Sequence, residues 1–309
     1  MTRRDLAPEL LPVIAAMPGW SAAKTIAATY ISGGITNRNY RVDVDGTPYF
    51  VRLAGERTEL LGIDRAHEKA ALDAAAGLGI APEVVAFLPD QHSIVTEWVD
   101  GDAVDEATVR EPEVLAPLVA ALRAFHQGPA IPGRFHVPDI VRSYHDHAIA
   151  HGVEVPHAFA DLLEIAREID VAFAHHAIPD RPCHNDLLCG NFLRTGDGVV
   201  IVDYEYAGMG DPFFDLGNLS VNNDFTDDDD HRLLELYFGA PTPPRVARLK
   251  LMRMVSDFRE SMWGVIQQGI STLDFDYVGY ANQHFARCQA QARNAQYDAW
   301  LRDASAAPV

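Results

Sequence analysis

The stretch CHNDLLCGN at residues 183–191, followed by IVDYE at residues 201–205, decides the fold of this chain. It places a carboxylate at Asp186, an amide at Asn191, and a second carboxylate at Asp203, after an apolar run typical of a strand. Phosphoryl transfer of the protein-kinase type requires these groups in this order. The spacing therefore predicts that Asp186 orients and deprotonates an acceptor hydroxyl, while Asn191 and Asp203 hold Mg²⁺ on ATP.

The residue two positions before Asp186 adds to this pattern. His184 occupies the place that braces the catalytic loop in such sites, so we include it among the catalytic residues. Each of these polar residues, taken alone, is equally typical of a surface loop. Their spacing and order, together with the apolar run, favour the phosphotransferase interpretation over that alternative.

Composition excludes several other classes of protein. With 309 residues and 48% apolar content, the chain is long enough for two lobes with their own cores. A formal net charge of −19 argues against a nucleic-acid partner, because phosphate backbones are bound by stripes of Lys and Arg. No apolar run approaches the roughly 20 residues that cross a bilayer. The three cysteines form no disulfide framework. We therefore expect a cytoplasmic protein without membrane insertion, and a homodimer is compatible with the sequence.

The hydrophobic periodicity changes near residue 101. Before it, period-two patterns and turn residues predict five strands and one helix, the helix with Asp64 as its N-cap. The strands are expected over residues 25–32, 39–44, 48–53, 83–88 and 93–99, and the helix over 64–78. After Gly101 a period of 3.6 predicts helices over 111–127, 139–151, 157–176, 227–238, 243–269 and 275–300. We also expect Thr226 to be the N-cap of the helix over 227–238.

This division predicts an α+β, two-lobe protein-kinase-like fold. A small five-stranded β-rich lobe, residues 1–100, would bind ATP, and a larger helical lobe, residues 101–309, would carry catalysis and acceptor binding. ATP would lie in the cleft between them, next to the linker at residues 97–101. The candidate nucleotide-binding residues of the turn after the first strand are Ser32, Gly33, Gly34, Thr36 and Asn37. Arg52 is placed to grip the phosphates and to pair with Glu68, and Glu97 of the linker completes the set.

These segments resemble the choline/ethanolamine kinases, a branch of the aminoglycoside-phosphotransferase-like kinases. About seven segments between residues 25 and 290 occur in the order of that family, from Ser32–Asn37 to Tyr280-Ala281. The resemblance implies that Asp186 is the base, that Asn191 and Asp203 bind Mg²⁺, and that Arg52 clamps the phosphates of ATP. It also implies an amino-alcohol substrate, choline or ethanolamine. The residues expected to line its site are Glu205, Tyr206, Trp263, Tyr280 and Phe258, because aromatic faces and carboxylates hold quaternary ammonium groups.

The chain departs from the choline kinases at one position of this site. Those enzymes commonly have a second Trp one helical turn before the one matched by Trp263, and here that position is Glu260. A carboxylate accepts hydrogen bonds from N–H donors and so favours a primary ammonium group, or a more polar cation. The sequence leaves open other acceptors of the same chemistry, namely thiamine, an aminoglycoside, methylthioribose or homoserine. It also leaves open a nucleotide-binding pseudokinase.

Overall fold

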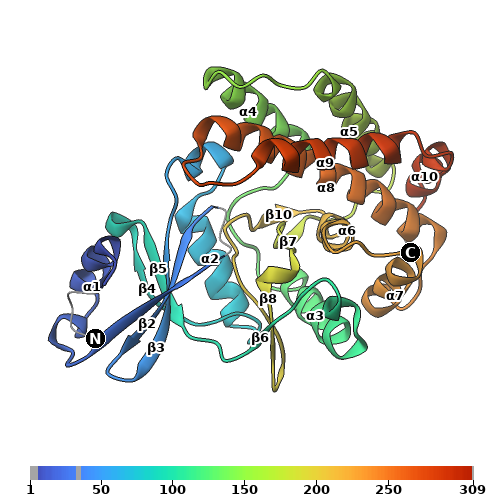
Figure 1. The fold of residues 1–309 in the computed structure, drawn as a ribbon. Coiled ribbons are helices and arrows are strands. Elements are labelled where there is room, and N and C mark those ends of the chain that lie inside the picture. Colours follow the sequence, from blue (N-terminus) through green and yellow to red (C-terminus); the bar gives the residue numbers. More distant parts are fainter. Residues whose placement is uncertain (1–5, 33–35, 308–309) are drawn as a thin grey trace.

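The computed structural model describes residues 6–32 and 36–307 and has the α+β architecture of the kinase-like fold (Figure 1). A five-stranded antiparallel sheet occupies the N-terminal part, and the C-terminal part is largely helical. The sheet has the order β1-β2-β3-β5-β4. Its strands are β1 (Ile26–Ile31), β2 (Arg38–Val44), β3 (Thr47–Leu53), β4 (Val84–Leu88) and β5 (Ser93–Glu97). This confirms the fold class and the five predicted strands.

The hairpin between β2 and β3 shows how local sequence sets the register of this sheet. Asp45 and Gly46 both have positive φ values, 49° and 89°, as a tight hairpin turn requires. Val44 therefore pairs with Thr47. With that register the alternate residues Tyr40, Val42 and Val44 are all buried. They pack with the short helix α1 (Leu11–Ala16) and with Trp20 in an N-terminal core.

Helix α2 (Arg65–Ala76) brings a carboxylate to the sheet. Its N-cap is Asp64, as predicted, whose side chain accepts from the backbone N–H groups of Ala66 and His67 at 2.8 and 3.1 Å. Glu68, in the first turn, is 2% exposed and forms an ion pair with Arg52 on β3. The predicted pairing of these two residues is therefore present.

The C-terminal region packs around one long helix, α8 (Pro243–Ile270), which contacts α4, α5, α6, α7, α9 and α10. The other predicted helices appear as α3 (Pro112–His126), α4 (Val137–Ala150), α5 (Ala158–Ala174) and α7 (Asp227–Phe238). Thr226 caps α7 in a capping box with Asp229, as the sequence predicted at the N-cap. None of the described helices is long and apolar enough to cross a membrane.

The prediction of one helix over residues 275–300 is wrong. The chain forms α9 (Tyr277–Ala292) and then α10 (Tyr297–Ala304). Between them, the side chain of Asn294 accepts from the backbone N–H of Gln296 at 2.9 Å. Asn side chains that bond to nearby backbone in this way offer an alternative to helical hydrogen bonds, so they favour turns over helix interiors.

Helix α6 (Pro212–Asn222) was not predicted, although its Asp215 bonds to the backbone of residues 184 and 185. Its start carries ordinary signals, because Asp211 caps the N–H of Phe213 at 2.8 Å and Pro212 follows at the first helical position. Its Gly217 lies against α8 so closely that a Cβ would come within 2.8 Å of Met252 and Arg253 backbone atoms. A glycine in mid-helix lowers helix propensity. The residue that allows this packing therefore also weakens the sequence pattern that would predict a helix here.

Five further short strands form two small sheets, one of two strands and one of three. Strands β7 (Arg181–Cys183) and β10 (Gly208–Gly210) pair with each other. Strands β8 (Phe192–Thr195) and β9 (Gly198–Ile201) form a hairpin that also pairs with β6 (Asp102–Ala103). Residues 183–191 thus begin at the end of one strand, and Asp203 follows the predicted apolar strand β9.

Candidate active site

A cavity of about 560 Å³ lies between the sheet and the helical region. Most of the predicted site residues line it, from both parts of the chain: Ser32, Thr36, Asn37, Arg52, Glu97, Asp186, Asn191, Asp203, Glu205, Tyr206, Glu260, Trp263 and Tyr280. Among the residues that the structure describes, Glu68 and His184 lie behind this lining rather than in it. Gly33 and Gly34 fall outside the described residues.

The loop at residues 183–191, predicted to be catalytic, is held by a buried carboxylate of α6. Asp215 of α6 is fully buried and accepts from the backbone N–H of His184 at 2.8 Å and of Asn185 at 2.7 Å. Asn185 has a φ of 68°, a conformation that costs free energy and persists only where the surroundings enforce it. These bonds explain how the loop keeps this shape, and they fix the backbone directly before Asp186.

His184 braces the same loop through its ring. Burial lowers the pKa of His184, so the imidazole is neutral. Its Nε2 lies 3.0 Å from the carbonyl oxygen of Val202, and its Nδ1 lies 3.3 Å from the backbone N–H of Asp186. The tautomer that satisfies both contacts carries its proton on Nε2, donates to Val202 and accepts from Asp186. His184 thereby ties the loop to the segment that carries Asp203.

Asp186 is surrounded by other carboxylates. Burial raises its pKa well above the usual range, the nearby Arg259 lowers it, and Glu260, Asp203 and Glu205 raise it further. The Nη1 atom of Arg259 lies 3.7 Å from Oδ1 of Asp186. A carboxylate that burial and like charges make more basic can accept a proton more readily than one in water.

Asn191 and Asp203 offer oxygen ligands of the kind that Mg²⁺ prefers. The Asn191 amide nitrogen donates to the backbone carbonyl of Asp186 at 2.8 Å, so the amide oxygen is its free end. Asp203, with a φ of 68°, forms an ion pair with Arg52. The donor set therefore fits Mg²⁺, and a metal ion at Asp203 would replace the charge that Arg52 now supplies.

Arg65, which the sequence analysis gave no role, connects the two parts of the chain at this cavity. Its Nη1 atom lies 2.7 Å from Glu68 and 3.0 Å from Glu205, and Asn37 donates to the same Glu205 oxygen at 2.8 Å. Glu205 lines the cavity, as expected, but one of its oxygens is already bonded to Arg65 and Asn37. Only its position in α2, one helical turn before Glu68, could have indicated Arg65.

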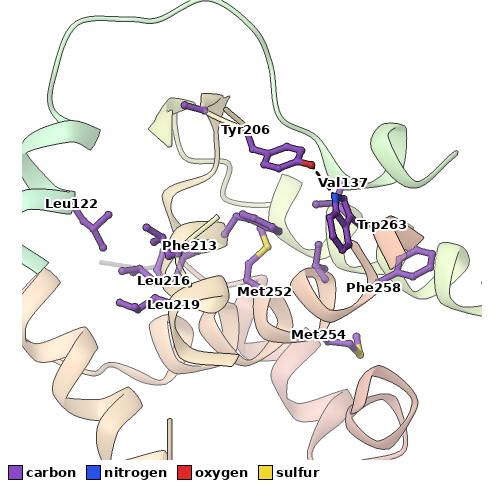
Figure 2. Close-up of a cluster of buried hydrophobic side chains, with 14 of the residues drawn as sticks. Leu122, Val137, Tyr206, Phe213, Leu216, Leu219, Met252, Met254, Phe258 and Trp263 are labelled. Atoms are coloured by element: carbon purple, nitrogen blue, oxygen red, sulfur yellow. Dashed lines mark hydrogen bonds between the residues drawn. The ribbon is translucent and has the colours of Figure 1, made fainter. Parts of the chain in front are cut away.

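The far end of the cavity combines aromatic rings with Glu260. The Trp263 indole N–H donates to the Tyr206 hydroxyl at 2.9 Å (Figure 2). The Trp263 ring meets Tyr280 in an edge-to-face contact, with centroids 5.4 Å apart. The Tyr280 hydroxyl donates to Glu260 at 2.8 Å. The expectation that Phe258 belongs to this group is wrong: within the described residues it lies outside the cavity lining and packs against Phe159.

Arg259 was missed by sequence reasoning. It is 1% exposed, lines the cavity, and donates to Glu260 at 2.6 Å. Its guanidinium carbon lies 4.1 Å from the centre of the Tyr206 ring. The only available signal was its place beside Glu260, the residue already singled out as unusual.

Comparisons with known proteins find relatives over most of the chain. The model of the phosphotransferase enzyme family matches residues 27–250. Ethanolamine kinase 2 of Mus musculus is 28% identical over 91% of this chain and 81% of its own length. A solved choline/ethanolamine kinase family protein from Mesorhizobium loti aligns with a TM-score of 0.82 at 30% identity, over 95% of this chain and 97% of that one.

A more distant solved relative supports the fold alone. Choline kinase LicA from Streptococcus pneumoniae aligns with a TM-score of 0.75 at 21% identity, over 91% of this chain and 98% of its own. LicA in complex with AMP aligns with a TM-score of 0.68 at 22% identity, over 87% and 94%.

Proposed function

The chain belongs to the choline/ethanolamine kinase family of phosphotransferases with an alcohol group as acceptor, and on that premise we propose that it transfers the γ-phosphoryl group of ATP to the hydroxyl of an amino alcohol, choline or ethanolamine. The observation that carries the proposal is the place of Asp186. It lines the same cavity as the phosphate-side residues Arg52 and Asp203 and the acceptor-side residues Glu260 and Trp263.

In the proposed reaction the residues around Asp186 position two reactants and move one proton. Asp186 accepts the proton of the acceptor hydroxyl, while the oxygen of that hydroxyl forms a bond to the γ-phosphorus. The bond from that phosphorus to the bridging oxygen breaks, and ADP leaves with the electron pair. Arg52, released from Asp203, holds the phosphates. Asn191 and Asp203 would hold Mg²⁺, which neutralises phosphate charge in such sites.

The assignment of separate functions to the two lobes, predicted from the sequence, remains part of the proposal. We propose that residues 1–100 bind ATP, through the turn after β1, Arg52 and the linker that includes Glu97, and that residues 101–309 bind the acceptor. The lining of one cavity by residues from both parts supports this. A cytoplasmic location is supported by the free state of the three cysteines.

Phosphorus NMR of the purified protein with Mg·ATP tests the acceptor. We expect a new phosphomonoester signal with ethanolamine or choline, and none with thiamine, homoserine, methylthioribose or kanamycin. A product formed only with one of those four would keep the phosphotransfer mechanism and overturn the assigned substrate. ATP binding without any product would instead favour the pseudokinase alternative.

Binding of Mg·ATP is expected to stabilise the protein in a way that depends on Asp203. At a free Mg·ATP concentration about 100 times its dissociation constant, the free energy of unfolding should rise by about 2.7 kcal/mol. The rise can be measured by calorimetric melting, and EDTA should remove most of it. In Asp203→Asn we expect about tenfold weaker Mg·ATP binding, a loss of about 1.4 kcal/mol. Equal stabilisation by ATP with and without Mg²⁺ would contradict the metal assignment, and Asp197→Asn, an exposed turn residue, is the control.

A further inference from the structure

Arg259 places a cation of the protein itself inside the acceptor end of the cavity. Its guanidinium stacks on the Tyr206 ring at 4.1 Å and is 1% exposed. Within residues 6–32 and 36–307, Glu260, at 2.6 Å, is the one carboxylate to which Arg259 donates a hydrogen bond, and Nε and Nη2 of Arg259 have no hydrogen-bond partner. A guanidinium with so few hydrogen bonds depends for its stability on the aromatic face, on the charge of Glu260, and on the charge of Asp186, whose Oδ1 lies 3.7 Å from Nη1.

The position of Arg259 changes what the aromatic residues can bind. A quaternary ammonium has no N–H donor, so it is held by the faces of aromatic rings. Here the guanidinium covers one face of Tyr206. Trp263 is 3% exposed and is enclosed by edge-to-face contacts with Tyr277 and Tyr280. Little aromatic surface is left for a trimethylammonium group, and the guanidinium would repel it at close range.

Glu260 retains the capacity to bind a different kind of ammonium group. Although burial acts to raise it, the pKa of Glu260 is lowered by Arg259, by His284 and by its bond from Tyr280, so the carboxylate is ionised. Each of its oxygens accepts one hydrogen bond, from Arg259 or from Tyr280. A carboxylate has about four acceptor positions, so about two remain for the N–H donors of a primary ammonium.

We propose that Arg259 is a specificity-determining residue: its guanidinium occupies the place on Tyr206 that a quaternary ammonium requires, so the site admits ammonium groups that donate hydrogen bonds to Glu260 and rejects trimethylammonium groups. The inference rests on the proposed function in taking the acceptor to be an amino alcohol. It assigns the preference for ethanolamine over choline to the Arg259–Glu260 pair.

Calorimetric titration in the presence of Mg·ADP measures the binding of each amino alcohol by itself, because no phosphoryl transfer occurs with ADP. We expect the wild-type protein to bind ethanolamine at least about tenfold more tightly than choline, a difference of about 1.4 kcal/mol. Arg259→Met should reduce that ratio about tenfold, because it removes the competing cation and leaves Glu260 as a counter-charge. Arg259→Lys, which keeps a cation beside Glu260, should still reject choline. The matched control Arg253→Met changes an arginine of the same helix that is bonded to Asp230, and should leave the ratio unchanged.

Two outcomes would overturn the inference. One is equal binding of choline and ethanolamine by the wild-type protein. The other is an unchanged ratio of the ethanolamine and choline affinities in Arg259→Met, measured on a variant with a native circular dichroism spectrum. If the Met variant does not fold, choline binding by Arg259→Lys would overturn the inference instead. Tetramethylammonium separates a failure of this inference from a failure of the proposed function. It carries no acceptor hydroxyl, so it reports on the cation site alone. Binding of tetramethylammonium gained on Arg259→Met would support the inference even if the wild-type protein phosphorylated neither amino alcohol, a result that would refute only the proposed function.

Discussion

Replacing Asp186 with asparagine is expected to lower kcat by about 10²- to 10⁴-fold, the usual contribution of a general base. The amide has the shape of the carboxylate but cannot accept the hydroxyl proton. The backbone carbonyl of Asp186, which accepts from Asn191 at 2.8 Å, is unchanged by the substitution. Mg·ATP affinity should therefore stay within about threefold, well below 1.4 kcal/mol. A coupled ADP-release assay gives kcat, and calorimetric titration gives the affinity.

The control for this prediction is Asp197→Asn, the same chemical change in the exposed turn between β8 and β9. It should leave both kcat and Mg·ATP affinity unchanged. If Asp186→Asn kept full turnover, Asp186 would lose the role of base. If it lost Mg·ATP binding together with turnover, Asp186 would belong to the nucleotide site instead.

Features that depend on neighbours in the sequence were predicted well. The Asp64 N-cap and the Thr226 N-cap each rest on bonds within a few residues, and both are present. The order Asp186, Asn191, Asp203 also belongs to this class, because a loop and the hairpin after it form one local unit. The roles of these three residues in catalysis stay predictions.

Two contacts between residues that lie far apart in the chain were not predicted from the sequence. Arg65 reaches Glu205 across 140 positions of the chain, and Arg259 stacks on Tyr206, a residue of a different segment. No local pattern distinguishes such an arginine from one on a helix surface. Phe258 lies five residues before Trp263, rather than three or four, so it faces another direction on α8 and packs against Phe159 of α5.

The replacement of Asp215 by alanine is expected to cost about 3–5 kcal/mol of the free energy of unfolding, the usual cost of removing one partner from a buried, charged network. Asp215 is fully buried, and its carboxylate accepts from the backbone N–H groups of His184 and Asn185 and lies 2.9 Å from Nε2 of His126. Alanine leaves these buried donors without an acceptor, and each such group carries a desolvation penalty. Urea unfolding measures the loss.

Asp230→Ala is the matched control that separates stability from positioning. Asp230 is 1% exposed and binds Lys250 and Arg253 at 2.7 Å each, so its loss should destabilise the protein by a comparable amount. It lies on α7 and makes no bond to the catalytic loop. At a temperature where both variants are folded, Asp215→Ala should therefore show a much lower kcat than Asp230→Ala, because Asp215, unlike Asp230, binds the backbone of Asn185 and so helps to position Asp186 beside it. Equal kcat values in the two variants would mean that other bonds keep the shape of the loop, such as those from the Asn185 amide to the carbonyl oxygens of Cys183 and Tyr206. Asp215 would then contribute to folding rather than to the geometry of the base.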